Sequence, residues 1–214
     1  MLRFRTALLV CAFILLAVVK AQAVTIFAAN LSNAVEVPAP TLTTTTGAPR
    51  PASSGTALFV LNDAQTALTF FATIFNIDVT GTQTADPNDN LLNAHIHAGP
   101  TAVPGSTAPV VWGFFGSPFN DNNPNDFHFT PFATGVGGTF TGKWDLPEGN
   151  NTTLTAQLPN ILAGHSYVNF HTVQNTGGEI RGFIVAASEP QTVSLLGIGL
   201  LALGIYGRRR LRSH

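Results

Sequence analysis

Charged residues are scarce in this chain of 214 residues. They make up 10% of it, beside 45% hydrophobic residues, whereas a soluble globular domain usually carries about 25% charged residues. Most of the ten basic residues lie near the two ends, so residues 24–187 keep three of them against ten acidic residues, a formal charge of −7. This stretch lacks the basic stripe that nucleic-acid binding requires, which excludes that class of partner.

Cysteine is nearly absent as well. The single thiol, Cys11, lies in an apolar run near the N-terminus. Removal of that run leaves no cysteine, which excludes disulfides, cysteine-ligated zinc and cysteine nucleophiles from the mature chain. The 16 phenylalanines can still form a large core, which argues against intrinsic disorder.

Residues 1–23 have the pattern of a secretory signal peptide. A basic start is followed by 14 mostly apolar residues, 6–19, and Ala21 and Ala23 fit the A-x-A cleavage rule. We expect a signal helix here, cut by signal peptidase after Ala23. An uncleaved membrane anchor is the alternative.

Residues 188–214 have the layout of a sorting tail. Glu189 and Pro190 precede an uncharged run, 192–207. As a helix this run is about 24 Å long, slightly under the thickness of about 30 Å of a bilayer core, so its flanking residues would need to snorkel; it is predicted as a transmembrane helix. The positive-inside rule keeps the arginines that follow it in the cytoplasm and places residues 24–187 on the far side, in agreement with the signal peptide. The arginine cluster, 208–212, includes Arg208, Arg209 and Arg210.

This tail resembles the PEP-CTERM sorting signal of Gram-negative bacteria in its Glu-Pro element, its Gly/Leu-rich span and its terminal arginines. The resemblance implies that an exosortase cleaves the tail during export to the cell surface. Ser188 stands where the family has its first proline. A plain C-terminal anchor is the alternative.

Residues 24–187 are predicted as one all-β domain. Runs of β-branched and aromatic residues recur between turn formers, and no stretch keeps a helical period. We expect eight or nine short antiparallel strands in a Greek-key β-sandwich, with a hairpin over 55–77 and a loop over 116–131. The predicted strands are 24–31, 55–61, 67–77, 92–97, 110–115, 139–144, 153–156, 166–172 and 179–185.

Side-chain alternation gathers polar residues on one face of three of these strands, because residues two apart in a strand point the same way. The apolar residues between them, such as Ile96, then point to the core. If the three strands are neighbours, their polar faces form one cluster. Its members are His95 and His97 on one strand, Tyr167, Asn169 and His171 on the second, and Glu179 and Arg181 on the third.

Two interpretations of this cluster stand side by side. An H-x-H pair with a distant third histidine can hold copper or zinc through neutral imidazoles, and Glu179 could orient one ring. Alternatively, the same residues form a buried network of salt bridges and hydrogen bonds that fixes the packing, with Glu179 bound to Arg181 or to a histidine.

Five segments of the chain resemble the CHRD domain, which is named after chordin and is widespread in secreted bacterial proteins. The resemblance implies an immunoglobulin-like β-sandwich with limited similarity to copper/zinc superoxide dismutase. It further implies that His95, His97 and His171 match copper ligands of the dismutase, and Arg181 its anion-guiding arginine. The segments are 27–38, 95–100, 109–111, 164–172 and 177–182.

Dismutase activity is nevertheless not expected. Residues 24–187 contain no cysteine for the dismutase disulfide. Only His128 and His165 remain between His97 and His171 to build a zinc site, and both lie in predicted loops or turns.

We therefore expect a non-enzymatic protein without a cofactor, exported across the inner membrane of a Gram-negative bacterium and sorted to its surface. Its β-domain would bind a protein partner or an extracellular polysaccharide. The alternative function is that of a periplasmic or surface metalloprotein with one copper or zinc ion on the histidines. Signal peptidase, exosortase and, before processing, the membrane are the other expected partners.

Overall fold

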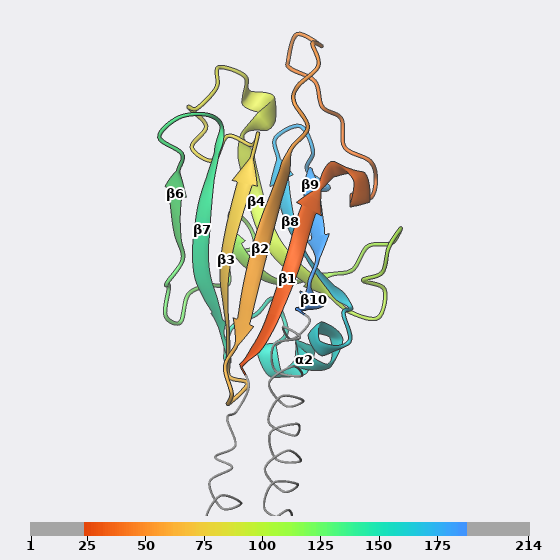
Figure 1. Cartoon of the computed structure of the whole chain (residues 1–214), viewed down its shortest axis with the longest axis vertical. Coiled ribbons are helices and arrows are strands. Elements are labelled where there is room, and N and C mark those ends of the chain that lie inside the picture. The colour runs from red at the N-terminus through yellow and green to blue at the C-terminus, as the bar shows by residue number, and fades with distance from the viewer. Residues whose placement is uncertain (1–23, 188–214) are drawn as a thin grey trace, which may run out of the picture.

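The computed structural model describes residues 24–187, and the regular secondary structure of this part of the chain is mostly β-strand (Figure 1). The all-β prediction is confirmed. The strands are β1 (Thr25–Ser32), β2 (Ser54–Leu61), β3 (Ala67–Phe75), β4 (Leu91–Ala98), β5 (Val110–Phe115), β6 (His128–Pro131), β7 (Gly137–Asp145), β8 (Ser166–Thr172), β9 (Ile180–Phe183) and β10 (Val185–Ala186). The helical elements are η1 (Asn33–Val35), η2 (Pro87–Asp89) and α2 (Leu154–Leu162).

The strands form one antiparallel sheet that curls over on itself. Its order is β5-β4-β8-β9-β1-β2-β3-β7-β6, and β10 pairs with β1. Residues far apart in this order touch across the interior. The Phe70 ring of β3 lies 5.8 Å from Trp112 of β5, and the Phe140 ring of β7 lies 5.4 Å from Phe170 of β8. The hydrophobic core therefore fills the space between the two halves of a single curled sheet (Figure 1).

The predicted hairpin is confirmed, and it shows how alternation fills the core. β2 and β3 pair along their whole length, from Ser54 opposite Phe75 to Leu61 opposite Leu68. In β2 every second residue is buried and those between are exposed. The turn is closed by a hydrogen bond from the Gln65 amide to the Asn62 carbonyl, as expected where asparagine begins a tight turn.

The prediction of a strand at 153–156 is wrong, because a helix, α2, begins there. Leu154, Leu158 and Ile161 are its buried residues, at the i, i+4, i+7 spacing of one helical face. The Thr153 side chain caps its N-terminus by accepting from the Ala156 amide. A helix of nine residues with Pro159 inside it carries too little periodic signal to stand out in the sequence.

A strand also lies inside the predicted loop 116–131. β6 pairs with β7, and all four of its residues are exposed, so it lacks the alternation that marks a strand in sequence. The curl brings β6 beside β5 at the other end of the sheet. The Phe115 and Phe129 rings pack edge to face with centroids 5.9 Å apart, and Phe127 contacts both.

Loops cover the outer face of β4, β8 and β9. All seven residues of β8 are buried, including those that point away from the hydrophobic core. The connections that supply the cover are 33–53, 99–109, 116–127 and 173–179. This part of the fold thus has a second, polar interior, and the candidate site lies in it.

The predicted signal helix and the predicted transmembrane helix at 192–207 lie outside the described residues. Within 24–187, no helix combines the length and apolar character that crossing a bilayer requires.

Candidate metal centre

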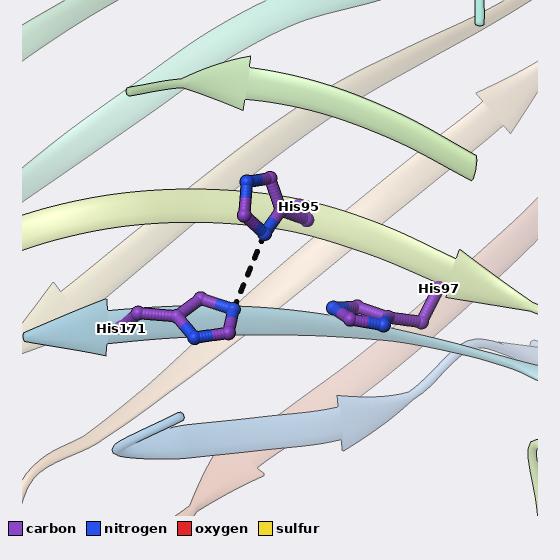
Figure 2. A group of neighbouring side chains, drawn as sticks. All are labelled: His95, His97 and His171. Atoms are coloured by element: carbon purple, nitrogen blue, oxygen red, sulfur yellow. Dashed lines mark hydrogen bonds between the residues drawn. The ribbon is translucent and has the colours of Figure 1, made fainter. Parts of the chain in front are cut away.

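Three histidines converge on the outer face of β4 and β8. His95 and His97 lie on β4, and their neighbours Ala94, Ile96 and Ala98 point into the hydrophobic core. His171 lies on β8, which pairs antiparallel with β4. One ring nitrogen of each histidine lies within 4.8 Å of the other two (Figure 2). The expected convergence is therefore present.

The site is closed rather than open to solvent. The exposed fractions of His95, His97 and His171 are 4%, 8% and 6%. Alternation predicts their direction correctly, but it does not reveal that loops lie over them.

Each ring is held by one backbone carbonyl from a covering loop. His95 Nε2 lies 3.0 Å from the Ser117 oxygen and His171 Nδ1 3.0 Å from the Thr176 oxygen. His97 Nδ1 lies 2.8 Å from the oxygen of Ala108. A carbonyl can only accept a hydrogen bond, so each ring donates an N–H to it. In a neutral imidazole the other nitrogen then carries a lone pair.

The other nitrogens of the three rings, which carry these lone pairs, face one another (Figure 2). His95 Nδ1 lies 3.2 Å from His171 Nε2, and His97 Nε2 is buried without a hydrogen-bond partner. With every ring neutral there is no hydrogen to place between these nitrogens. The centre is therefore a set of three buried acceptors without a donor, the arrangement that a metal ion satisfies.

Burial keeps the rings neutral. It is the main cause that lowers the pKa of His95 from 6.5 to about 4 and that of His97 to about 3. The pKa of His171 is lowered too, by burial and by the charge of Arg181, against the hydrogen bond to Thr176. At neutral pH all three rings are free of the extra proton that would compete with a metal.

Tyr167 and Arg181 border the centre. The Tyr167 ring stacks on His97 with centroids 4.7 Å apart, and the Arg181 guanidinium lies 4.3 Å from the centre of the Tyr167 ring. Arg181 is bound by Glu36, which accepts from its Nε at 2.8 Å. Both side chains are almost fully buried. Glu36 comes from the loop after β1, and alternation within the strands could not identify it.

The expected roles of Glu179 are wrong. Its carboxylate binds Arg50, with Arg50 Nη2 2.7 Å from Glu179 Oε2, rather than Arg181 or a histidine. It also accepts hydrogen bonds from Ser53, Thr172 and Asn175. The physical reason is that the 33–53 connection passes over the sheet and brings Arg50 to Glu179. This connection has no periodic sequence pattern, so its path could not be predicted from the sequence.

Asn169 lies between the centre and the Arg181 pair. In the register it stands opposite His95 on one side and Arg181 on the other. It is 1% exposed, and its Oδ1 is buried without a partner. Its amide packs against the backbone of Gly178, where an added Cβ would lie 2.6 Å from Nδ2.

His128 and His165 do not join the centre. His128 is an exposed residue of β6, and His165 precedes β8. Among the described residues, His95, His97 and His171 are the one group of three or more potential ligands close enough to share an ion. The predicted processing residues lie outside the described range. They are Ala21, Ala23, Glu189, Pro190, Arg208, Arg209 and Arg210.

Comparison with known proteins gives a family match. A family model described as the CHRD domain matches residues 27–184. A search of curated proteins and a search of solved structures found no match.

Proposed function

This chain belongs to the CHRD domain family, and on that premise we propose that it is an exported protein whose domain binds one copper or zinc ion through His95, His97 and His171. The observation that carries the proposal is the set of three inward lone pairs. Each ring gives its one N–H to a carbonyl, which leaves His97 Nε2 without a partner and two further acceptors 3.2 Å apart.

A proton cannot satisfy these nitrogens equally well. A shared proton between His95 and His171 would place a positive charge in a buried site near Arg181, and burial already lowers the pKa of both rings. A purely structural hydrogen-bond network therefore accounts for the outer nitrogens of the rings but lacks donors for the three inner ones.

The donor spacing fits a metal after a contraction of up to about 1 Å. Three bonds of about 2.1 Å to one ion hold the ligand nitrogens about 3.4–3.6 Å apart, and the three nitrogens here lie within 4.8 Å of one another, with His95 and His171 already at 3.2 Å. Side-chain rotation that moves His97 Nε2 toward the other two nitrogens would close the difference. The three carbonyls act like the hydrogen-bond partners that orient histidine ligands in metal sites, because they fix which nitrogen of each ring is free.

We propose that the protein is not an enzyme. The metal centre is buried under the loops that hold its rings, which favours retention of an ion over turnover of a substrate. The lack of cysteine in the domain and the separate positions of His128 and His165 argue against dismutase activity.

Export and surface sorting are part of the same proposal. They rest on the signal-peptide pattern of residues 1–23 and on the likeness of residues 188–214 to a PEP-CTERM signal, with signal peptidase and exosortase as processing partners in a Gram-negative host. The curled sheet is compatible with the finer fold assignment, an immunoglobulin-like or dismutase-like Greek-key sandwich. Binding of a protein or polysaccharide at the cell surface is the second proposed function, supported by these sorting signals.

Metal analysis of the purified protein tests the proposal. After loading with Cu or Zn and removal of excess metal, we expect about one ion per chain. His97→Ala should lose most of it, whereas His128→Ala, at an exposed position outside the centre, should retain it. Less than a tenth of an ion per chain in the unaltered protein, or full retention in His97→Ala, would contradict the proposal.

A further inference from the structure

We propose that the centre binds copper as the monovalent ion, Cu(I), in preference to Zn²⁺ and Cu²⁺. This inference rests on the proposed metal-binding function and specifies its ion. It follows from the charges that surround the three rings and from the number and kind of donors that the site offers.

The centre offers no negative charge to the ion. Its three ligands are neutral, and Glu36, a carboxylate at its border, is already paired with Arg181. The other buried carboxylate of this polar interior, Glu179, is paired with Arg50. Each ion pair is close to neutral as a unit, so neither compensates a cation on the histidines.

The positive charge of a bound ion is therefore not compensated by a negative charge in this buried position. The cost of moving an ion out of water rises with the square of its charge, and it is already large for a single charge. A divalent ion thus meets about four times the penalty of a monovalent ion of similar size.

The number of donors points the same way. Zn²⁺ takes four ligands, and Cu²⁺ prefers a tetragonal set of nitrogen and oxygen donors. The centre supplies three imidazole nitrogens, and the surrounding carbonyls of Ser117, Ala108 and Thr176 are engaged with the ring N–H groups. Cu(I), with its lower charge, is satisfied by three donors.

The kind of donor is consistent with this assignment. Cu(I) favours soft ligands such as thiolate and thioether, but residues 24–187 contain neither cysteine nor methionine. Imidazole nitrogen is the softest donor that this domain can offer, and the centre uses three of them.

Competition titrations of the metal-free protein test the inference. Cu(I) affinity is measured without oxygen against bicinchoninate, and Zn²⁺ affinity against pyridylazoresorcinol. We expect one Cu(I) per chain, bound about 1,000-fold more tightly than Zn²⁺. Protein loaded with Cu²⁺ and ascorbate should then stay silent in electron paramagnetic resonance after return to air.

A charge-adding variant shows whether charge sets the preference. Asn169→Asp keeps the shape of the side chain and adds one negative charge beside the rings. It should strengthen Zn²⁺ binding more than Cu(I) binding and reduce the preference at least about tenfold. Asn151→Asp adds the same charge at an exposed loop position and should leave the preference unchanged. If Asn169→Asp does not fold, the titrations of the unaltered protein still decide the matter.

The outcomes separate the inference from the proposed function. Binding of neither ion overturns both. Binding of Zn²⁺ or Cu²⁺ as tightly as Cu(I) overturns the inference and leaves the metal centre standing. An unchanged preference in Asn169→Asp contradicts the argument from charge.

Discussion

His95 Nδ1 and His171 Nε2 lie 3.2 Å apart with a lone pair on each, because both rings donate their N–H groups outward to backbone carbonyls. Two acceptors at this distance repel unless a cation lies between them. The hydrogen bonds to the carbonyls thus determine which ring nitrogens are free to bind a cation. They also make the stability of the metal-free protein sensitive to acid.

Acid should destabilise the metal-free protein between pH 6.5 and 4. The unfolded chain takes up protons on its histidines as the pH falls below 6.5, whereas the folded state resists protonation until about pH 4 at His95 and about pH 3 at His97. Stability is therefore fully present above pH 6.5 and is lost as the pH falls. From pH 7 to 5 we expect the free energy of unfolding, measured with urea, to drop by about 2–4 kcal/mol. In His97→Gln the drop should be smaller, and a pH-independent wild type would contradict the burial argument.

Asp121→Asn should stabilise the protein in mild base. Burial, together with the negative charges of Asp126, Glu148 and Asp145, raises the pKa of Asp121 to about 7, against a hydrogen bond from the Asp126 amide. The folded state therefore holds a proton that the unfolded state has lost, and stability declines as the pH rises from about 4 to 7. A shift of this size corresponds to about 4 kcal/mol, and we expect about half, because nearby water and carboxylates relax. Urea unfolding should show this gain at pH 8 and none at pH 4.

Glu179→Gln should destabilise the protein by about 3–5 kcal/mol, because it leaves Arg50 buried without its partner. Lys143→Ala is the matched control. Lys143 pairs with Asp126 and Asp145 at a position about one-third exposed, so its loss should cost less than about 1 kcal/mol. Chemical denaturation of both variants at pH 7 provides the measurement. Equal losses would mean that burial does not decide the strength of these pairs.

Gly178→Ala should disturb the border of the candidate metal centre. Gly178 has φ +131°, and an added Cβ would lie 2.6 Å from both Glu36 Oε2 and Asn169 Nδ2. Gly164→Ala is the comparison, since Gly164 has φ +74° with nothing within 4 Å of an added Cβ. Backbone strain alone should cost about 1–2 kcal/mol at Gly164, and Gly178→Ala should lower the thermal midpoint clearly further. Equal thermal midpoints for the two variants would show that the close approach at Gly178 does not require glycine.

Processing of the ends is tested by intact mass. In a host with an exosortase, the mature protein should lack residues 1–23 and most of 188–214, because both ends carry a processing pattern and agree in topology. Retention of Arg208 to Arg212 would leave the plain-anchor alternative. A host without an exosortase is the control, and there the tail should remain.

Much of the site follows from strand alternation alone. The H-x-H pair on β4 and His171 on β8 were expected to share one face, because period-two projection depends only on local backbone geometry. The roles of Glu36, Arg50 and the three carbonyls could not be predicted in this way. They come from connections that cross the sheet, and no periodic pattern fixes where a connection passes.

The same distinction explains the errors in the predicted secondary structure. Strands with one buried face, such as β2, can be recognised in the sequence because apolar and polar residues alternate along them. β6 is exposed throughout and α2 is short, so tertiary contacts rather than their own patterns determine them. Long-range pairing, here β8 between β4 and β9, likewise depends on the complete chain.

The contact between Phe115 and Phe129 bears on how copies of this protein behave when crowded. A sheet edge is normally a template onto which another chain can add a strand, the first step toward fibrils. Here the two end strands face each other across a seam of phenylalanine rings, and β6 is four residues long and ends at Pro131, which cannot donate a backbone hydrogen bond. The curl thus protects the protein against edge-to-edge polymerisation while it shapes the core.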